Sequence, residues 1–280
     1  MLLAAPAVLH FLLTTSIPVV AAFVLSFTDY SPLDTPHWIG LENYRRVLSD
    51  ELFWTAARNT GLYVLGLVPV SLAFGLAVAL ALNERLRGRA FYRTAFYLPH
   101  VTAGAAIAVI WLWIYNPQFG LLNAMLLAVG LPRQSWLVSP TWALWAIVLV
   151  GIWARTGYLM IIFLAALQGI PETLYEAAKL DGAGRWQRFW SITLPLLGPA
   201  TFLALVVTLI EGAQVFQSVY VMTNGGPGYA TTTMAREIFR NAFEHFQLGY
   251  ASAWAFLLFA AIFVVTMINR KLVPSDVDYV

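Results

Sequence analysis

The chain has 280 residues, with 16 Lys and Arg against 14 Asp and Glu and a formal net charge of +2. Hydrophobic residues make up 60% of it, charged residues 11%, and its mean hydropathy is +0.73, which excludes an ordinary soluble domain and predicts an integral membrane protein. The sequence contains no cysteine, so disulfides, thiolate metal sites and a cysteine nucleophile are excluded. No basic cluster with interleaved aromatic residues lies outside the loops that flank the membrane, and nothing indicates nucleic acid binding.

Six segments are apolar and long enough to cross a bilayer, which takes roughly 20 residues of helix. We therefore predict an all-α membrane protein whose residues 1–280 form one transmembrane domain. The first segment is not predicted to be a cleavable signal, because it lacks a basic start, contains Pro6 and Pro18 and is too long. No inverted repeat or pair of broken helices is visible. The spans are predicted at residues 2–27, 60–82, 95–115, 142–167, 196–222 and 250–268.

The distribution of basic residues predicts the orientation. Nine of them follow the second, fourth and sixth segments and six lie on the other side, and Arg and Lys are enriched in cytoplasmic loops. Both termini and a loop over residues 168–195 are therefore predicted to be cytoplasmic. The nine are Arg85, Arg87, Arg89, Arg93, Lys179, Arg185, Arg188, Arg270 and Lys271, and the six are Arg45, Arg46, Arg58, Arg133, Arg236 and Arg240.

Two ionisable residues, Arg155 and Glu211, lie near mid-depth in the fourth and fifth segments. Such charges cost several kcal/mol unless they are paired or hydrated. One interpretation is a structural ion pair between neighbouring spans. The other is a hydrated path for a polyol, in which carboxylate and amide groups bind hydroxyls and aromatic rings face the sugar. The residues that would line this path are Arg155, Glu211, Gln214, Phe216, Gln217 and Tyr220. Both interpretations stay open, and the polar strip formed by Gln214 and Gln217 favours the path slightly.

The most polar stretch covers residues 171–195. Pro171 is expected at the first position of a short helix over residues 172–181, with Glu172 and Glu176 near its positive end and Gly182 and Gly184 ending it. Leu174, Ala177, Ala178 and Asp181 fall on one face of this helix, a low stripe onto which another protein surface could close. Trp186, Phe189 and Trp190 then recur at helical spacing, typical of a helix at a membrane surface, and Pro195 is expected to end it.

A second polar loop begins at Thr223 and contains the turn cluster Asn224, Gly225, Gly226 and Pro227, which cannot continue a helix. His37 and His100 have no further ligands at metal spacing, so a metal site is not predicted. No Walker motif, GxGxxG or Ser-His-Asp order is present, and the chain has no visible means of hydrolysing ATP.

The polar stretch also carries a spaced motif. Glu176-Ala177-Ala178, three residues, Gly182, nine residues and then Ile192-Thr193-Leu194-Pro195 resemble the EAA signature of permease subunits in bacterial ABC importers. Residues 40–44 and the segment from Thr223 to Pro227 resemble sugar-type permeases, those of maltose, glycerol-3-phosphate and trehalose importers.

This resemblance implies a type I ABC importer permease fold in a bacterial inner membrane. It implies import of a di- or oligosaccharide or a related polyol together with a second homologous permease, two ATPase subunits and an extracytoplasmic substrate-binding protein. ATP and Mg would be held by the ATPase subunits and no cofactor by this chain. The outer residues Asn224, Gly225, Gly226 and Pro227 would face the binding protein. The helix that docks on the ATPase would present Glu172, Leu174, Glu176, Ala177, Ala178, Leu180, Asp181 and Gly182.

The alternative is a stand-alone secondary transporter or channel driven by an ion gradient. The lack of an inverted repeat or of broken helices argues against it, as does a loop with the shape of a docking helix. A membrane enzyme would need a paired acid and base at the membrane face, and none is visible.

Overall fold

The computed structural model describes residues 5–84 and 86–272, so the first three residues of the expected first span, and Arg85, lie outside the described residues. The described part is helical, with one isolated β-bridge between Thr28 and Trp38. Its elements are α1 (Ala5–Phe11), π-helix η2 (Leu12–Ser16), α2 (Ile17–Leu25), α3 (Glu42–Ser49), α4 (Glu51–Asn83), α5 (Arg89–Val101), α6 (Gly104–Ile114), α7 (Leu121–Ala128), α8 (Ala143–Gly169), α9 (Glu172–Leu180), α10 (Arg185–Arg188), η3 (Phe189–Thr193), α11 (Leu194–Leu196), α12 (Gly198–Ala213), α13 (Gln217–Met222), α14 (Met234–Phe239), η4 (Arg240–Glu244) and α15 (Leu248–Leu272).

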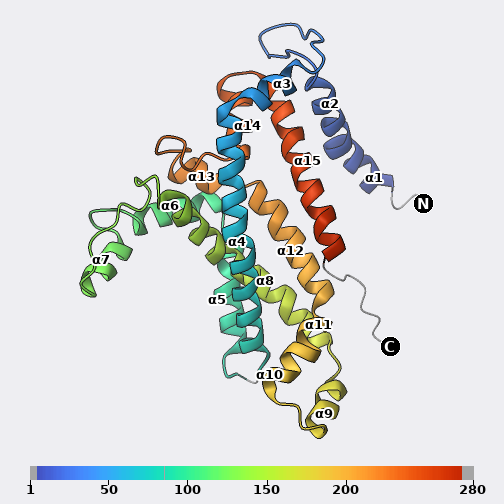
Figure 1. The fold of residues 1–280 in the computed structure, drawn as a ribbon, viewed down its shortest axis with the longest axis vertical. Coiled ribbons are helices and arrows are strands. Elements are labelled where there is room, and N and C mark those ends of the chain that lie inside the picture. Colours follow the sequence, from blue (N-terminus) through green and yellow to red (C-terminus); the bar gives the residue numbers. More distant parts are fainter. Residues whose placement is uncertain (1–4, 85, 273–280) are drawn as a thin grey trace.

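Helices α4, α8, α12 and α15 form the central bundle, with α3 and α14 at one end and α9 at the other (Figure 1). We call these the α3 end and the α9 end. Small residues let the longest helices approach closely: a Cβ added at Gly75 of α4 would lie 2.6 Å from Leu159 Cβ of α8. Within the described ranges, five helices are long and apolar enough to cross a membrane, or six if α5 and α6 count as one bent span.

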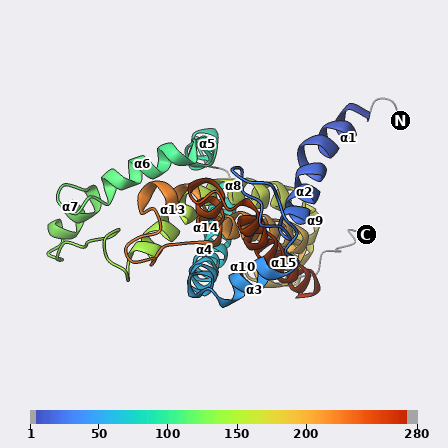
Figure 2. The same cartoon turned by 90° about the horizontal axis from the view of Figure 1, so that it is seen from above.

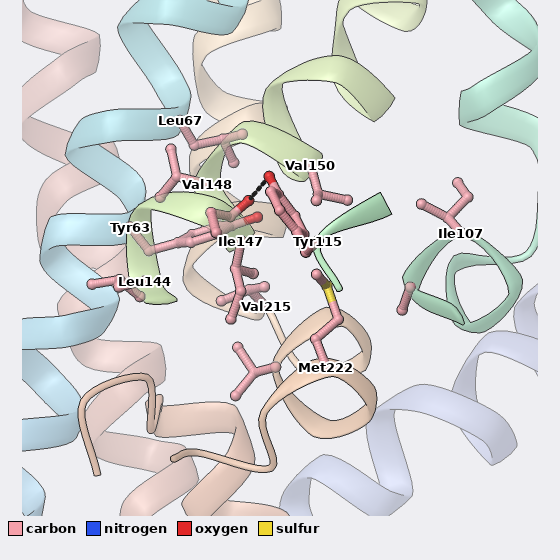
Figure 3. Close-up of a cluster of buried hydrophobic side chains, with 13 residues drawn as sticks. Tyr63, Leu67, Ile107, Tyr115, Leu144, Ile147, Val148, Val150, Val215 and Met222 are labelled. Carbon is pink, nitrogen blue, oxygen red and sulfur yellow. Dashed lines mark hydrogen bonds between the residues drawn. The ribbon is translucent and has the colours of Figure 1, made fainter. Parts of the chain in front are cut away.

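One cluster of buried side chains joins α4, α6, α8 and α13 in the middle of the molecule (Figure 3). Tyr115 is 1% exposed, and its hydroxyl donates to the carbonyl oxygen of Ala146 at 2.9 Å, so the polar tip of this buried ring is satisfied. Further clusters lie towards the α9 end, around Phe163, and towards the α3 end, around Trp254. The cores thus follow the bundle along its length.

The first span packs differently from the others. Helices α1 and α2 slant away from the bundle and meet it near the α3 end, where the rings of Phe23 and Phe256 are 5.0 Å apart (Figures 1 and 2). None of the residues in the apolar window of this span is buried inside the chain. Its apolar surface is therefore free to contact lipid or another subunit.

The third predicted span, residues 95–115, is not one straight helix. It consists of the C-terminal part of α5 and of α6, which meet at an angle of 99° across Thr102 and Ala103. The two halves pack against different helices. Helix α5 crosses α8 at the close contact between Gly157 and the carbonyl group of Phe96, and α6 packs on α13 at the close contact between Gly104 and the Gln217 side chain. Because of the bend, α6 and α7 extend sideways as an arm (Figure 2).

The fifth span is also interrupted, after Ala213, and α13 restarts at Gln217. The carbonyl oxygen of Val215, inside the break, accepts a hydrogen bond of 3.0 Å from the Thr233 hydroxyl. A side chain distant in sequence therefore satisfies a carbonyl oxygen that has no partner within the helix. An interrupted helix is tolerated inside a membrane when its backbone groups are hydrogen-bonded in this way. The expectation that no helices are broken is wrong. Pro99 and Gly104 flank the first break, whereas residues 214–216 at the second break contain no glycine or proline that would mark it in the sequence.

Candidate functional site

Helix α9 is the most protruding element at the α9 end and none of its residues is buried (Figure 1). It runs from Glu172 to Leu180, close to the predicted 172–181, but Pro171 is its N-cap residue with ψ 129°, not its first helical residue. At the other end Gly182 has φ +80°. The N–H of Ala183 donates to Ala178 O at 2.8 Å and that of Gly182 to Lys179 O at 3.1 Å, a Schellman ending.

The predicted docking stripe is open to solvent. Leu174 is 42% exposed and Leu180 is 90% exposed, Ala177 is exposed and Ala178 is half-buried. The carboxylates of Glu172, Glu176 and Asp181 are exposed too and form no ion pair with any residue in the described part of the chain. Apolar and acidic groups thus form an uncovered surface on a helix whose two ends are fixed.

One side of α9 is anchored to the bundle. The hydroxyl of Tyr175 lies 3.0 Å from that of Thr193, which is 5% exposed, and the ring packs on the core towards the α9 end. Thr193 belongs to π-helix η3, which contains the exposed ring of Trp190 and follows the exposed ring of Trp186 in α10. Pro195 does not end the helix as expected. The wider π turn before it accommodates the proline ring, and helical structure continues through α11 and α12.

A polar cavity of about 520 Å³ lies where α4, α5, α6, α8, α12 and α13 converge, beside the central cluster of Figure 3. Four of the predicted path residues besides Arg155 line it: Glu211, Gln214, Phe216 and Gln217. Both interruptions of the helices border this cavity, because His100 and Gly104 flank one break and Gln214 and Gln217 the other. Interrupted backbone in a membrane is tolerated where it lines such a cavity.

Arg155 and Glu211 form an ion pair on the cavity wall. The Arg155 side chain is 17% exposed and that of Glu211 is 41% exposed, so the carboxylate side of the pair opens into the cavity. Arg155 also lies 5.7 Å from the ring centre of Tyr158, and its Nη1 is buried without a hydrogen bond among the described residues. The two interpretations of these charges are therefore compatible, since the pair exists and lines a polar space.

Other residues of the site differ from the prediction. Tyr220 does not line the cavity; its ring stacks on Phe216 at 5.2 Å between centroids, outside it. Tyr63 and His100 line it without having been predicted. The His100 ring stacks on Tyr158 with 4.6 Å between the ring centres, and the described part of the chain contains no group of three metal-ligating side chains. In the sequence, a single tyrosine or histidine in an apolar helix looks the same whether its side chain lines a cavity or packs in the core.

The predicted outer loop, at the α3 end, is held in place by hydrogen bonds. Asn224 is exposed and accepts from Arg236 Nε at 2.9 Å, Gly225 is buried, and Gly226 and Pro227 are half-buried. Asn59 of α4 donates to the carbonyl oxygens of Tyr229 and Thr232, at 2.9 and 3.0 Å. The loop is thus rigidly attached, and only part of its predicted contact surface is accessible.

A second structured feature at this end is the first outer loop. The backbone N–H of His37 donates to Asp29 Oδ1 at 2.6 Å, and this hydrogen bond lowers the pKa of the exposed Asp29 carboxyl. His37 Nδ1 lies 3.4 Å from the other carboxylate oxygen. His37 therefore has a local structural contact with Asp29.

The fold and the cavity define a polytopic helical membrane protein with a polar space between its spans. Residues 71–275 match the family described as "Binding-protein-dependent transport system inner membrane component", and the chain belongs to this family. Members of the family are membrane components of transport systems.

The similarity to known proteins extends over nearly the whole chain. It is 40% identical to "Probable ABC transporter permease protein YesP" of Bacillus subtilis (strain 168), over 98% of this chain and 90% of that protein. It is 38% identical to "Trehalose/maltose transport system permease protein MalF" of Thermococcus litoralis, over 91% of this chain and 86% of the relative.

The solved structure of a bacterial ABC transporter for import of the acidic polysaccharide alginate superposes with a TM-score of 0.83 at 26% identity, over 95% of this chain and 92% of that one. A complex of such a transporter with an alginate pentasaccharide-bound periplasmic protein gives a TM-score of 0.85 at 25% identity, over 98% and 95%. The predicted family and all-α permease fold are confirmed.

Proposed function

We propose that this chain is the permease subunit of a carbohydrate importer and forms half of the translocation path with a second homologous permease. Family membership supports a binding-protein-dependent transport role. The cargo class is supported by the relatives' names: besides the trehalose/maltose permease, the chain is 38% identical to a sulfoquinovosyl glycerol permease and 34% identical to a diacetylchitobiose permease.

The observation that carries the proposal is the cavity of about 520 Å³ at the two helix interruptions. Glu211, Gln214 and Gln217 offer acceptors and amide donors to hydroxyl groups, and the Phe216 ring offers an apolar face. Because Arg155 and Glu211 neutralise each other, the wall has polar groups without a net charge from this pair. Such a surface suits a neutral sugar that passes as the path opens alternately to the two sides.

The exposed α9 supports a second part of the proposal, docking on a cytoplasmic ATPase. Its stripe has low relief at Ala177 and Ala178, a fixed position through Tyr175, and acidic groups at Glu172 and Glu176. In this proposal two ATPase subunits bind and hydrolyse ATP with Mg, and closure of the ATPases moves α9 and with it the bundle. This chain itself performs no catalysis.

The α3 end would then face outward. Asn224 and the accessible parts of Gly226 and Pro227 provide a rigid surface for an extracytoplasmic substrate-binding protein, while the buried Gly225 supports the turn. We place both termini and residues 168–195 in the cytoplasm of a bacterium and count the bent α5–α6 pair as one of six spans. The distribution of basic residues supports this orientation.

Family membership favours this proposal over a stand-alone transporter driven by an ion gradient. A reconstitution experiment separates them. The tagged chain is purified with the subunits that accompany it and placed in liposomes with labelled sugars. We expect uptake only with internal-side ATP and an added binding protein. Uptake by the chain alone, driven by an ion gradient, would overturn the proposal.

A further inference from the structure

Arg89 and Arg93 form a cationic pair at the start of α5, at the α9 end. They lie one helical turn apart and both point to the end of α8 (residues 143–169). With the Gln168 amide oriented so that its oxygen faces them, that oxygen accepts from Arg89 Nη2 at 2.7 Å and from Arg93 Nη2 at 3.0 Å. Two positive groups thus converge on one neutral acceptor.

Most hydrogen-bonding capacity of this pair is unused. A guanidinium carries five N–H donors, and here Nε of both Arg89 and Arg93 is buried without a partner in the described part of the chain. Within those same residues neither side chain forms an ion pair, and Glu84, the nearest carboxylate in sequence before them, is exposed and unpaired. Among the described residues, the site therefore holds two positive charges without a carboxylate counter-ion.

The backbone adds to this positive potential. Gly88 occupies the N-cap position with φ +77°, so no side chain caps α5, and its first turn contains no acidic residue. The N-terminal end of a helix carries a partial positive charge of its own. The C-terminal end of α8, to which the arginines point, offsets only part of this charge, and an anion bound between the two arginines would offset the rest.

The residues around Arg89 and Arg93 indicate how deep the pair lies relative to the membrane surface. Phe91 is 72% exposed and Tyr92 is 46% exposed beside the pair, and Leu98 further along α5 is 58% exposed. Aromatic rings with apolar residues behind them are typical of a helix that enters the membrane at headgroup level. Helix α9 lies farther out along the long axis than the start of α5 (Figure 1). These exposed rings at the start of α5, short of the surface that α9 presents, favour a position of the pair at the depth of lipid phosphates.

We propose that Arg89 and Arg93 bind the phosphate of an anionic phospholipid at the α9 end. Arginine forks pair with phosphate oxygens through parallel hydrogen bonds, and basic pockets between membrane helices bind such head groups. The bound phosphate ties α5, which borders the cavity at His100, to the end of α8 from which α9 follows. This site is independent of the cargo and of the proposed import function.

Native mass spectrometry of the full chain, purified in mild detergent with its accompanying subunits, tests the site. Phosphatidylglycerol or phosphatidylcholine is added, and retained lipids are counted. We expect the unmodified chain to prefer phosphatidylglycerol at one site, and the double variant Arg89→Gln with Arg93→Gln to retain about 10-fold less. The matched control is Arg87→Gln, which removes an exposed arginine just before the helix and should retain the lipid.

Three results would overturn the assignment. The first is equal retention of the two lipids by the unmodified chain, a measurement that does not depend on how any variant folds. The second is retention of phosphatidylglycerol by the double variant at the level of the Arg87→Gln control. The third is displacement of the lipid by millimolar inorganic phosphate, which would assign the site to a free anion.

Discussion

Arg155 and Glu211 show how single residues combine structure and chemistry in this protein. The guanidinium is mostly enclosed and the carboxylate opens into the cavity, with side-chain exposures of 17% and 41%. A mostly enclosed arginine without its partner is costly in a membrane, because the little water that reaches it replaces the lost carboxylate only in part. The pair therefore stabilises the contact between α8 and α12 while its open side remains available to cargo.

Glu211→Gln should lower the stability and abundance of the protein, because Arg155 loses its counter-ion. Since the carboxylate is partly solvated, we expect a loss of about 1–3 kcal/mol, less than for a fully buried pair. The measurement is membrane abundance together with a thermal melt in detergent. The double variant Arg155→Gln with Glu211→Gln should recover abundance but still take up little sugar, since both groups line the cavity. Wild-type abundance and uptake in Glu211→Gln would contradict both roles.

Gly157 is a second residue whose identity is dictated by its position. A side chain there would collide with the carbonyl oxygen of Phe96 at the crossing of α5 and α8. Gly157→Ala should therefore push the two helices apart and cost about 1–3 kcal/mol. Gly169→Ala on the same helix is the control, because nothing lies within 4 Å of the added Cβ. A thermal melt compares the two, and equal melting temperatures would show that the crossing tolerates separation.

At the scale of the element, α9 depends on how it ends. Gly182 has φ +80° and nothing lies within 4 Å of an added Cβ, so a substitution there acts through backbone strain alone. Gly184 has φ −68° and equally open surroundings, so it provides a control that differs only in conformation. The two glycines thus separate the shape of the helix end from the presence of a side chain.

Gly182→Val should strain the end of α9 by about 1 kcal/mol or more and misdirect the exposed stripe. Membrane abundance should stay near normal, while sugar-stimulated ATP hydrolysis by the assembled complex falls strongly. Gly184→Val should leave hydrolysis nearly unchanged. The idea that α9 transmits motion to an ATPase fails if both variants keep normal stimulation at equal abundance.

At the scale of the whole molecule, the bundle has two chemically different ends. The α9 end carries an exposed helix and the arginines at the start of α5. The α3 end carries a rigid loop that is hydrogen-bonded to Asn59 of α4. Because the chain has no cysteine, any cysteine introduced is unique and can report which end faces which side. The proposed orientation can therefore be tested in intact cells.

Lys179→Cys on α9 and Arg133→Cys in the loop before α8 are suitable reporters, because both positions are exposed. We expect a membrane-impermeant maleimide to label Arg133→Cys in intact cells and Lys179→Cys only after the membrane is opened. The unmodified chain controls for background labelling. The reverse pattern would show that the orientation inferred from basic residues is inverted.

The sequence alone was sufficient for the membrane class, the all-α fold, the family and, to within one residue, the boundaries of α9. These properties depend on local signals: apolar runs of bilayer length, a helix that stops at a glycine with positive φ, and a motif with fixed spacing. The family match covers residues 71–275, a range that includes the EAA-like residues and the Thr223 loop. Which residues contact an ATPase or a binding protein stays a prediction.

Only the tertiary structure decided where the spans break and what the breaks border. The bend between α5 and α6 depends on contacts with Gly157 and Gln217, and the break after Ala213 depends on Thr233, eighteen residues beyond Val215. A sequence window contains none of these partners. The same holds for Arg155 and Glu211: their pairing on the wall of a cavity follows from the crossing of α8 and α12, which brings together residues that are far apart in the chain.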